Sequence, residues 1–433
     1  MIPKRSWIFA ILVLAVASCA SALGQTKPSL DTTTFIVMGE GLAAGMADYG
    51  LSTVVQQYSF PAQMAAQMNT GFEQPLIQPP GIGDVIGYPR QEVVVQKYPQ
   101  GSVRQFYLPT DPTKAPISTP PLFVSNVSVP GQTLNDSITL KPVAPVVQRS
   151  NMKQTVFNMI LGFPQLILDN VPLLTQFEYA KTMFPTMALI ELGYYEALDA
   201  AVNSDVTRLP DPNTFLSTYN SVLAGFRGLQ AQVIATTIPN PLDTAYFSSP
   251  AAAAAITSTA PSVLTDLFQL TPQDYVTRNG LLAIGNKFLN GVIGPLPAGS
   301  VLTGAVAANL TTRINALNAQ IATAAKNNGA VLYDLNAFLH KIKVSGAKVG
   351  NTTVTANYLG GFYSLDAIYP GATGHALIAN DILTFLNQTY QQSFPMINVS
   401  TVASIDQSLS AIKPSGELNT AETLGISIDG GNQ

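Results

Sequence analysis

Short apolar runs of strand length alternate along the chain with stretches in which apolar residues recur at helical spacing. The strand-like runs lie at residues 33–38, 187–192, 232–238 and 330–335, and each ends at a polar or turn residue. Helical spacing extends over 303–327, and 375–394 is predicted to be the last helix. This alternation is typical of a parallel sheet covered by helices, so we expect an α/β fold.

A proline-rich stretch over about 72–122 interrupts this pattern after the first strand. It contains a possible hairpin, with strands at 92–98 and 103–108. So many prolines exclude a continuous helix, and we therefore expect an insertion that lies over the top of the sheet. Such an insertion is either a lid or ligand wall beside a site, or a surface ornament.

The N-terminus has the pattern of an export signal. Two basic residues precede an apolar run over 7–17, which is too short to cross a bilayer as a helix and is followed by small residues. We place the signal at 1–22, where ordinary cleavage after Ala22 competes with a lipobox-like sequence that ends at Cys19. We expect an exported protein, periplasmic, extracellular or held at the outer membrane, with a lipid at Cys19 as its only membrane attachment.

Composition excludes several classes of function. Loss of the signal with its two basic residues takes the formal net charge from −4 to −6, and no basic run is interleaved with aromatic residues, so we expect no nucleic-acid partner. Cys19 is the only cysteine, and the two histidines, His340 and His375, have no second ligand at metal-binding spacing. We therefore expect no disulfide, no metal and no cofactor. Residues 23–400 are expected to form a single domain, followed by a polar tail at 401–433.

Four segments, in order along the chain, resemble the four sequence blocks of the SGNH (GDSL-type) ester hydrolases. They are residues 35–45, 126–131, 190–198 and 361–380. The chain looks like the bacterial exported branch of that family, in which a proline-rich segment follows the first block. The resemblance implies a three-layer α/β/α, flavodoxin-like fold with a central parallel sheet and a proline-rich insertion after the first block.

The two most informative blocks keep the outline of a catalytic site but lack its reactive residues. Gly39-Glu40-Gly41-Leu42 stands where the family reads Gly-Asp-Ser-Leu, and Asp366-Ala367-Ile368-Tyr369-Pro370 stands where it reads Asp-x-x-His-Pro. In that family the serine attacks an ester, the histidine takes its proton, and the aspartate orients the histidine. Backbone N–H groups and an asparagine side chain stabilise the oxyanion.

Carried over by this resemblance, Asp366 matches the aspartate and Gly131 matches the oxyanion glycine. Gly41, Tyr195 and Tyr369 stand at the serine, asparagine and histidine positions. Glycine has no side-chain oxygen, and a phenol with a reference pKa of about 10 is a poor base near pH 7. Loss of the nucleophile alone removes roughly 10⁶-fold of rate in a serine triad, so we expect no SGNH-type esterase activity.

The sequence leaves three functions open. The first is an envelope protein whose pocket, relined by Tyr194, Tyr195 and Tyr369, binds a cell-wall glycan, an acylated polysaccharide or a lipid. The second is a hydrolase, an esterase or a carbohydrate-active enzyme, that uses non-standard carboxylates. The third is a residual hydrolase in which another hydroxyl replaces the missing serine. The candidate carboxylates for the second function are Glu40, Glu196 and Asp366. The candidate hydroxyls for the third are those of Ser125, Ser128 and Thr133.

Structural roles compete with each of these assignments. Glu40 and Glu196 could replace family aspartates that fix loops through hydrogen bonds. His375, at the start of the last predicted helix, is interpreted as structural, and His340, on a helical face, as solvated. The hydroxyls beside the second block are interpreted as ordinary hydrogen-bonding groups of turns unless a base lies next to them.

Overall fold

The computed structural model describes residues 29–78, 81–82, 93–97, 102–106, 121, 123–148, 151–163, 165–166, 171–257, 259–292 and 294–410. The predicted export signal with Cys19, most of the proline-rich stretch and residues 411–433 lie outside these ranges. Within them, no helix combines the length and apolar character that a bilayer-spanning segment needs.

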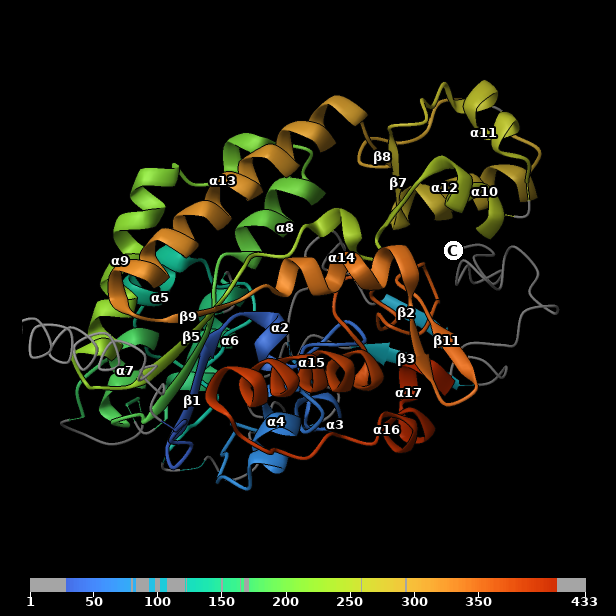
Figure 1. Cartoon of the computed structure of the whole chain (residues 1–433). Coiled ribbons are helices and arrows are strands. Elements are labelled where there is room, and N and C mark those ends of the chain that lie inside the picture. The colour runs from blue at the N-terminus through green and yellow to red at the C-terminus, as the bar shows by residue number, and fades with distance from the viewer. Residues whose placement is uncertain are drawn as a thin grey trace, which may run out of the picture.

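A four-stranded parallel sheet forms the centre of the molecule (Figure 1). Its strands, in spatial order, are β1 (Phe35–Gly39), β4 (Met187–Glu191), β5 (Gln232–Thr236) and β9 (Val331–Tyr333). β1 and β4 are buried along their whole length, as expected for parallel strands that are covered on both faces. All four predicted strands are confirmed, and their ends lie within two residues of the predicted ones.

The segment that resembles the second sequence block extends this sheet beyond β1. The Val37 N–H donates to the Ser125 carbonyl at 2.9 Å, and the Val127 N–H donates to the Val37 carbonyl at 2.9 Å. The Val129 N–H donates to the Gly39 carbonyl at 3.1 Å. The segment therefore runs parallel to β1, and the residues that follow it reach the same edge of the sheet as the residues that follow β1.

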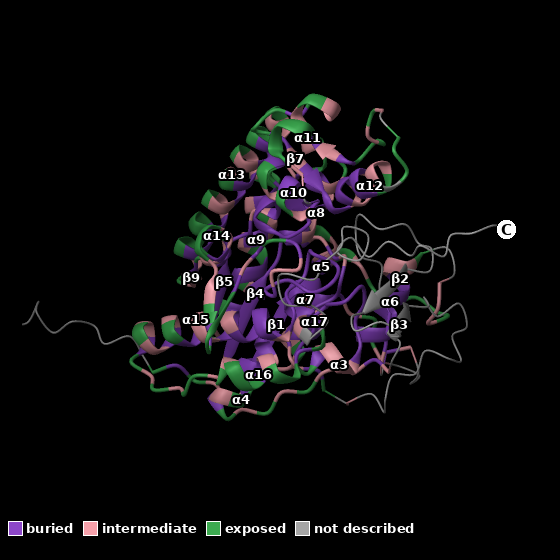
Figure 2. Cartoon of the chain, turned by 90° about the vertical axis from the view of Figure 1, so that its right-hand side faces the viewer, coloured by how far each residue is buried: buried purple, intermediate pink, exposed green. Residues whose placement is uncertain are grey.

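Helices cover both faces of the sheet, which confirms the predicted α/β fold (Figure 1). α7 (Gln176–Thr182), α9 (Pro212–Arg227) and α13 (Gly304–Asn328) lie on one face, and α4 (Phe60–Met68) and α15 (Ala372–Tyr390) lie on the other. Buried residues fill the sheet and the inner sides of these helices, whereas the outer sides of α13 and α16 are exposed (Figure 2).

Two of these helices were expected from the sequence. α13 begins and ends within one residue of the predicted 303–327, and it stops at Gly329, which has a φ of 67°. α15 begins three residues before the predicted start, but it is not the last helix, because two more follow it.

Shorter elements complete the described part of the chain. They are α2 (Gly41–Ala44), α3 (Thr53–Gln56), the hairpin β2 (Val93–Lys97) and β3 (Ser102–Phe106), α5 (Leu134–Thr139), α6 (Met152–Leu161), α8 (Tyr194–Val202), the 3₁₀ helices η2 (Val206–Arg208) and η3 (Pro241–Asp243), α14 (Leu335–Ser345), β10 (Ala347–Val349) and β11 (Thr352–Val354). The hairpin confirms the predicted strand pair in the proline-rich stretch.

A small lobe connects β5 to α13 and lies to one side of the sheet (Figure 1). It contains a three-stranded antiparallel sheet and three helices. Its elements are β6 (Phe247–Ser248), α10 (Pro250–Ile256), α11 (Pro261–Phe268), β7 (Tyr275–Thr277), α12 (Arg278–Leu289) and β8 (Val301–Leu302).

The polar tail predicted from residue 401 begins too early. α16 (Val399–Ile405) spans that boundary, and α17 (Gln407–Ser410) follows it. The Asp406 carboxylate accepts a hydrogen bond at 2.8 Å from the Thr373 N–H in the first turn of α15. The Ser408 hydroxyl donates to Asp48 Oδ1 at 2.8 Å. These buried contacts make residues 401–410 part of the folded domain.

Candidate functional site

Segments far apart in the sequence meet at one edge of the sheet. Gly41 follows β1, Gly131 follows the strand-like segment beside β1, and Tyr195 lies in the first turn of α8 after β4. Tyr369 lies in the loop before α15. Carboxyl ends of parallel strands are the usual place for ligands in open α/β sheets. These four of the five positions that the sequence aligned with catalytic residues are thus neighbours in the fold.

The Tyr369 side chain occupies the space that a side chain at position 41 would need. A Cβ built on Gly41 would lie 2.7 Å from Tyr369 Oη and 2.8 Å from Cζ. Contacts this short are not tolerated between carbon and a packed ring, and Tyr369 is only 2% exposed. The glycine is therefore required by the close approach of the phenol, which stands where a serine side chain would begin.

The Glu40 carboxylate binds the backbone donors around Gly41. Its Oε1 accepts from the Leu42 N–H at 2.9 Å, which caps α2, and its Oε2 accepts from the Tyr369 hydroxyl at 3.1 Å. Burial raises the Glu40 pKa to about 7, while hydrogen bonds from the Gly41 and Gly131 backbone oppose the increase. These two N–H groups are the ones that the family resemblance assigns to an oxyanion, and here a side chain of the chain itself faces them.

Glu191 is a second buried carboxyl at this edge, and sequence reasoning did not select it. It is the last residue of β4, and its Oε2 accepts from the Glu40 and Ala43 N–H groups, both at 3.3 Å. Burial first, and the nearby Glu40 charge second, raise its pKa well above the ordinary value. A lone carboxyl at the end of an otherwise apolar strand was the signal available in the sequence.

The first turn of α8 contributes three of the predicted residues. Glu196 Oε1 accepts from the Leu134 N–H at the start of α5, at 2.7 Å, and burial raises its pKa to about 7. Tyr194 is buried, whereas Tyr195 is half-buried and its ring lies 3.7 Å from a Cβ built on Gly131. Glu196 therefore joins α8 to α5, and Tyr195 is the most accessible aromatic ring of the candidate site.

Asp366 hydrogen-bonds to backbone donors, two of them in its own loop. Oδ1 accepts from the Ile368 and Tyr369 N–H groups, both at 2.8 Å, and Oδ2 accepts from the Tyr49 N–H at 3.3 Å. Burial raises its pKa to about 6. Where a triad aspartate would orient a histidine ring, this one holds the backbone of the loop that carries Tyr369.

The histidines lie outside this cluster. His340 Nδ1 lies 3.1 Å from both carboxylate oxygens of Asp243, and the imidazole remains 64% exposed. His375 is buried in the first turns of α15, and its Nδ1 accepts from the Phe60 N–H at 3.3 Å. Burial lowers the His375 pKa to about 3, so this ring is neutral near pH 7.

The candidate hydroxyls have structural neighbours. Ser125 Oγ accepts from the Glu73 N–H, and Thr133 caps α5 together with Asp136. Ser128 Oγ is buried and has no hydrogen-bond partner among the described residues. None of the described hydrogen bonds joins one of these three hydroxyls to a histidine.

The buried carboxyls of the candidate site bind protons tightly, but none of the described residues of the site is an activated nucleophile. Burial raises the pKa of each of its carboxyls, so each binds a proton more tightly than an exposed acid does. Glu40 is 0% exposed, so a substrate cannot touch it without movement of the residues around it. This geometry suits a closed structural centre better than acyl transfer.

No family model matches the sequence, and neither does any curated protein. Among solved structures, an α/β hydrolase enzyme, LAE5, from the metagenome of Lake Arreo, Spain, aligns at 12% identity over 86% of this chain and 100% of that chain, with a TM-score of 0.36. TesA aligns at 11% identity over 82% of this chain and 98% of that chain, with a TM-score of 0.34. The α/β assignment rests on the sheet order and helix layers of this molecule, and the SGNH family stays a prediction.

Proposed function

We propose that the chain is an exported SGNH hydrolase-like protein that has lost ester hydrolysis and serves as a glycan- or lipid-binding protein of the bacterial envelope. The observation that carries the loss of activity is the contact between Gly41 and Tyr369. A nucleophile at position 41 would need the space that the Tyr369 phenol fills, 2.7 Å from the Cβ position.

Loss of the oxyanion site supports the same proposal. Stabilisation of a tetrahedral intermediate requires donors about 3 Å from the developing oxyanion, with that position free for substrate. Here the Glu40 carboxylate accepts from the Leu42 N–H and the Tyr369 hydroxyl, and the nearby Gly41 and Gly131 backbone groups lower its pKa. A negatively charged or proton-sharing carboxyl at this place opposes an oxyanion. Side chains of the protein therefore occupy both the space for a nucleophile and the place for the oxyanion.

The binding half of the proposal rests on the aromatic surface that remains. Tyr195 is half-buried beside Gly131, and rings of this kind stack on sugar rings and pack against acyl chains. The envelope location rests on the export signal that the sequence predicts.

The test combines an active-site label with turnover. The purified chain is treated with a fluorophosphonate and assayed on p-nitrophenyl acetate. We expect no added mass in the intact protein and a hydrolysis rate equal to that of buffer with an inert protein. Stoichiometric labelling of one serine, with turnover that the label abolishes, would overturn the proposal.

A second candidate is a hydrolase in which buried carboxyls divide acid and base roles. The observation in its favour is that burial raises the pKa of both Glu40 and Glu196 to about 7, the range of a general acid at neutral pH. Turnover of aryl glycosides that is lost in Glu196→Gln and kept in the surface variant Asp266→Asn would favour this candidate. Equal background rates in all three proteins would remove it.

A further inference from the structure

The residues before β1, β4, β5 and β9 form the edge of the sheet opposite to the candidate site, which we call the amino edge (Figure 1). The described chain begins here. Gln232, the first residue of β5, donates through Nε2 to the Ser29 carbonyl at 3.2 Å, and its Oε1 accepts from the Asp31 N–H at 2.7 Å. An attachment that precedes Ser29 in the chain therefore holds the protein by the amino edge.

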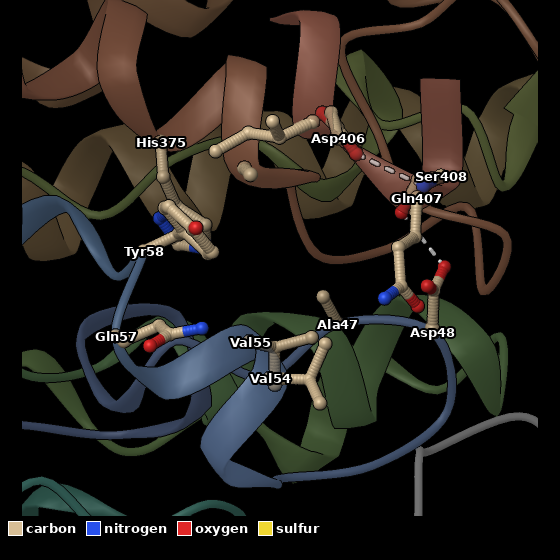
Figure 3. A pocket seen from close by; sticks show the side chains of 12 residues that line it. Ala47, Asp48, Val54, Val55, Gln57, Tyr58, His375, Asp406, Gln407 and Ser408 are labelled. Atoms are coloured by element: carbon tan, nitrogen blue, oxygen red, sulfur yellow. Dashed lines mark hydrogen bonds between the residues drawn. The ribbon is translucent and has the colours of Figure 1, made fainter. Parts of the chain in front are cut away.

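The helix α15 runs between the two edges. Its first turn lines a cavity of about 120 Å³ together with residues of the α16–α17 junction (Figure 3). Just beyond its other end, Gln392 Nε2 donates to Ser29 Oγ at 2.9 Å. A helix of 19 residues is about 28 Å long. The amino edge is thus remote from this cavity and from the candidate site.

An exposed aromatic ring lies at the amino edge. Phe184, between α7 and β4, is 73% exposed, the largest fraction among the large apolar side chains of the described residues. Its φ of 48° is a left-handed conformation that a bulky residue before a proline rarely adopts. Its N–H donates to the Lys181 carbonyl at 3.1 Å. A strained backbone that holds a large apolar ring in water indicates a contact surface.

Three basic side chains lie at the same edge. α7, α9 and α13 lead into β4, β5 and β9, and each ends with a basic residue in its last turn, namely Lys181, Arg227 and Lys326. Arg227 Nη1 donates to the Asn327 carbonyl at 3.4 Å, which joins the ends of α9 and α13. The Phe177 and Phe226 rings, 5.7 Å apart, join α7 to α9. The three helix ends are therefore neighbours.

The amino edge carries an excess of positive charge among these residues. None of the three basic side chains forms an ion pair among the described residues, and both Arg227 and Lys326 are exposed. Asp31 contributes one negative charge, so these four residues sum to +2, whereas the whole chain has a formal charge of −4. A basic residue in a last turn stabilises its own helix. Three neighbouring ones also attract an anionic partner.

We propose that the amino edge contacts an anionic lipid bilayer. Phe184 enters the headgroup region, and the three basic side chains bind anionic headgroups. Aromatic rings suit the boundary between apolar chains and water, and basic residues near an anionic bilayer strengthen attachment. The candidate site at the opposite edge then faces away from the membrane.

The chain before Ser29 supplies the attachment. Cys19, the predicted lipid position, precedes Ser29 by ten residues (29 − 19), and an extended chain of that length spans at most about 35 Å. A lipid and a basic surface together hold a protein to a membrane more firmly than either alone. The inference rests on the envelope location in the proposed function and not on the loss of ester hydrolysis.

Tryptophan fluorescence tests the contact. Trp7, in the predicted signal, is the only tryptophan, so Phe184→Trp adds one reporter to the exported and processed protein. On phosphatidylcholine–phosphatidylglycerol vesicles with brominated acyl chains, we expect strong quenching of this reporter. Val344→Trp, at a 70% exposed position on α14 away from the amino edge, is the matched control and should not be quenched. Equal quenching of both, or of neither, would overturn the proposal.

Charge variants test the electrostatic part. Arg227→Gln with Lys326→Gln should weaken binding to these vesicles about tenfold, because both side chains lie at the amino edge. Lys341→Gln with Lys348→Gln removes the same charge from exposed positions on α14 and β10 and should bind as the parent does. Equal loss in the two pairs, or parental binding by the first, would contradict the proposed surface.

Cell fractionation tests the location separately. A chain that stays in the cytoplasm would contradict the envelope location, on which this surface rests. An exported chain whose reporter at position 184 is not quenched would contradict the membrane surface alone.

Discussion

At the scale of single residues, the candidate site is defined by the Tyr369 side chain, which fills the space beside Gly41. The sequence showed that a nucleophile and a base are absent at positions 41 and 369. It could not show that the Tyr369 phenol lies against Gly41, because the two residues are more than 300 positions apart and their contact depends on packing. Glu191 was missed for the same reason, since only the fold places it beside Glu40.

The contact between Gly41 and Tyr369 predicts a strong energetic coupling. Gly41→Ala places a methyl group 2.7 Å from Tyr369 Oη and should lower the free energy of unfolding by about 1–3 kcal/mol. In a Tyr369→Ala background the same change should have little effect, because the ring is gone. Urea denaturation of the four proteins of this cycle measures the coupling, and additive effects would show that the two side chains do not compete for space.

The buried carboxyls predict a stability that falls as the pH rises. Burial raises the Glu196 pKa from 4.5 to about 7, so the folded state holds this proton more tightly than the unfolded state does. Its contribution is complete below about pH 4.5 and is lost as the pH rises through about 7, a change of up to about 3 kcal/mol.

Glu196→Gln tests this pH dependence, because the amide keeps an acceptor for the Leu134 N–H but cannot ionise. The free energy of unfolding of the variant should fall less than that of the parent between pH 5 and pH 8. Asp266→Asn should follow the parent. A Glu196→Gln profile parallel to the parent profile would show that Glu196 does not titrate in this range.

At the scale of elements, the strands were the easiest part to predict. Parallel strands buried on both faces appear in a sequence as short continuous apolar runs, and all four runs form strands within two residues of the expected ends. The C-terminal helices were not predicted. α16 and α17 have only seven and four residues. They are held by long-range hydrogen bonds that Asp406 accepts and Ser408 donates, which no local pattern reveals.

The link between α15 and the C-terminal helices predicts the effect of Asp406→Ala. This change removes the acceptor for the Thr373 N–H in the first turn of α15, so we expect the free energy of unfolding to fall by about 1–2 kcal/mol. Asp406→Asn retains an amide oxygen and should recover part of the loss. If Asp406→Ala unfolds at the same urea concentration as the parent, the carboxylate does not stabilise α15.

At the scale of the whole molecule, an α/β layer structure brings residues from β1, β4, the segment beside β1 and the loop before α15 to one edge of the sheet. The sequence predicted this meeting place from the order of the blocks and from the topology of parallel sheets. The fold adds that the place is occupied by the protein's own side chains. The proposed loss of ester hydrolysis would thus result from filled space as well as from missing groups.

A variant that restores the catalytic residues of an ester hydrolase tests the proposed loss of activity most directly. The variant Glu40→Asp, Gly41→Ser, Tyr195→Asn, Tyr369→His shortens the carboxyl, clears the space beside position 41 and supplies nucleophile, donor and base together. Its rate on p-nitrophenyl acetate is compared with that of the same variant carrying Gly41→Ala. The account predicts ester cleavage by the serine version and none by the alanine version. Equal background rates in two folded proteins would contradict the claim that these residues occupy a former ester-cleaving site.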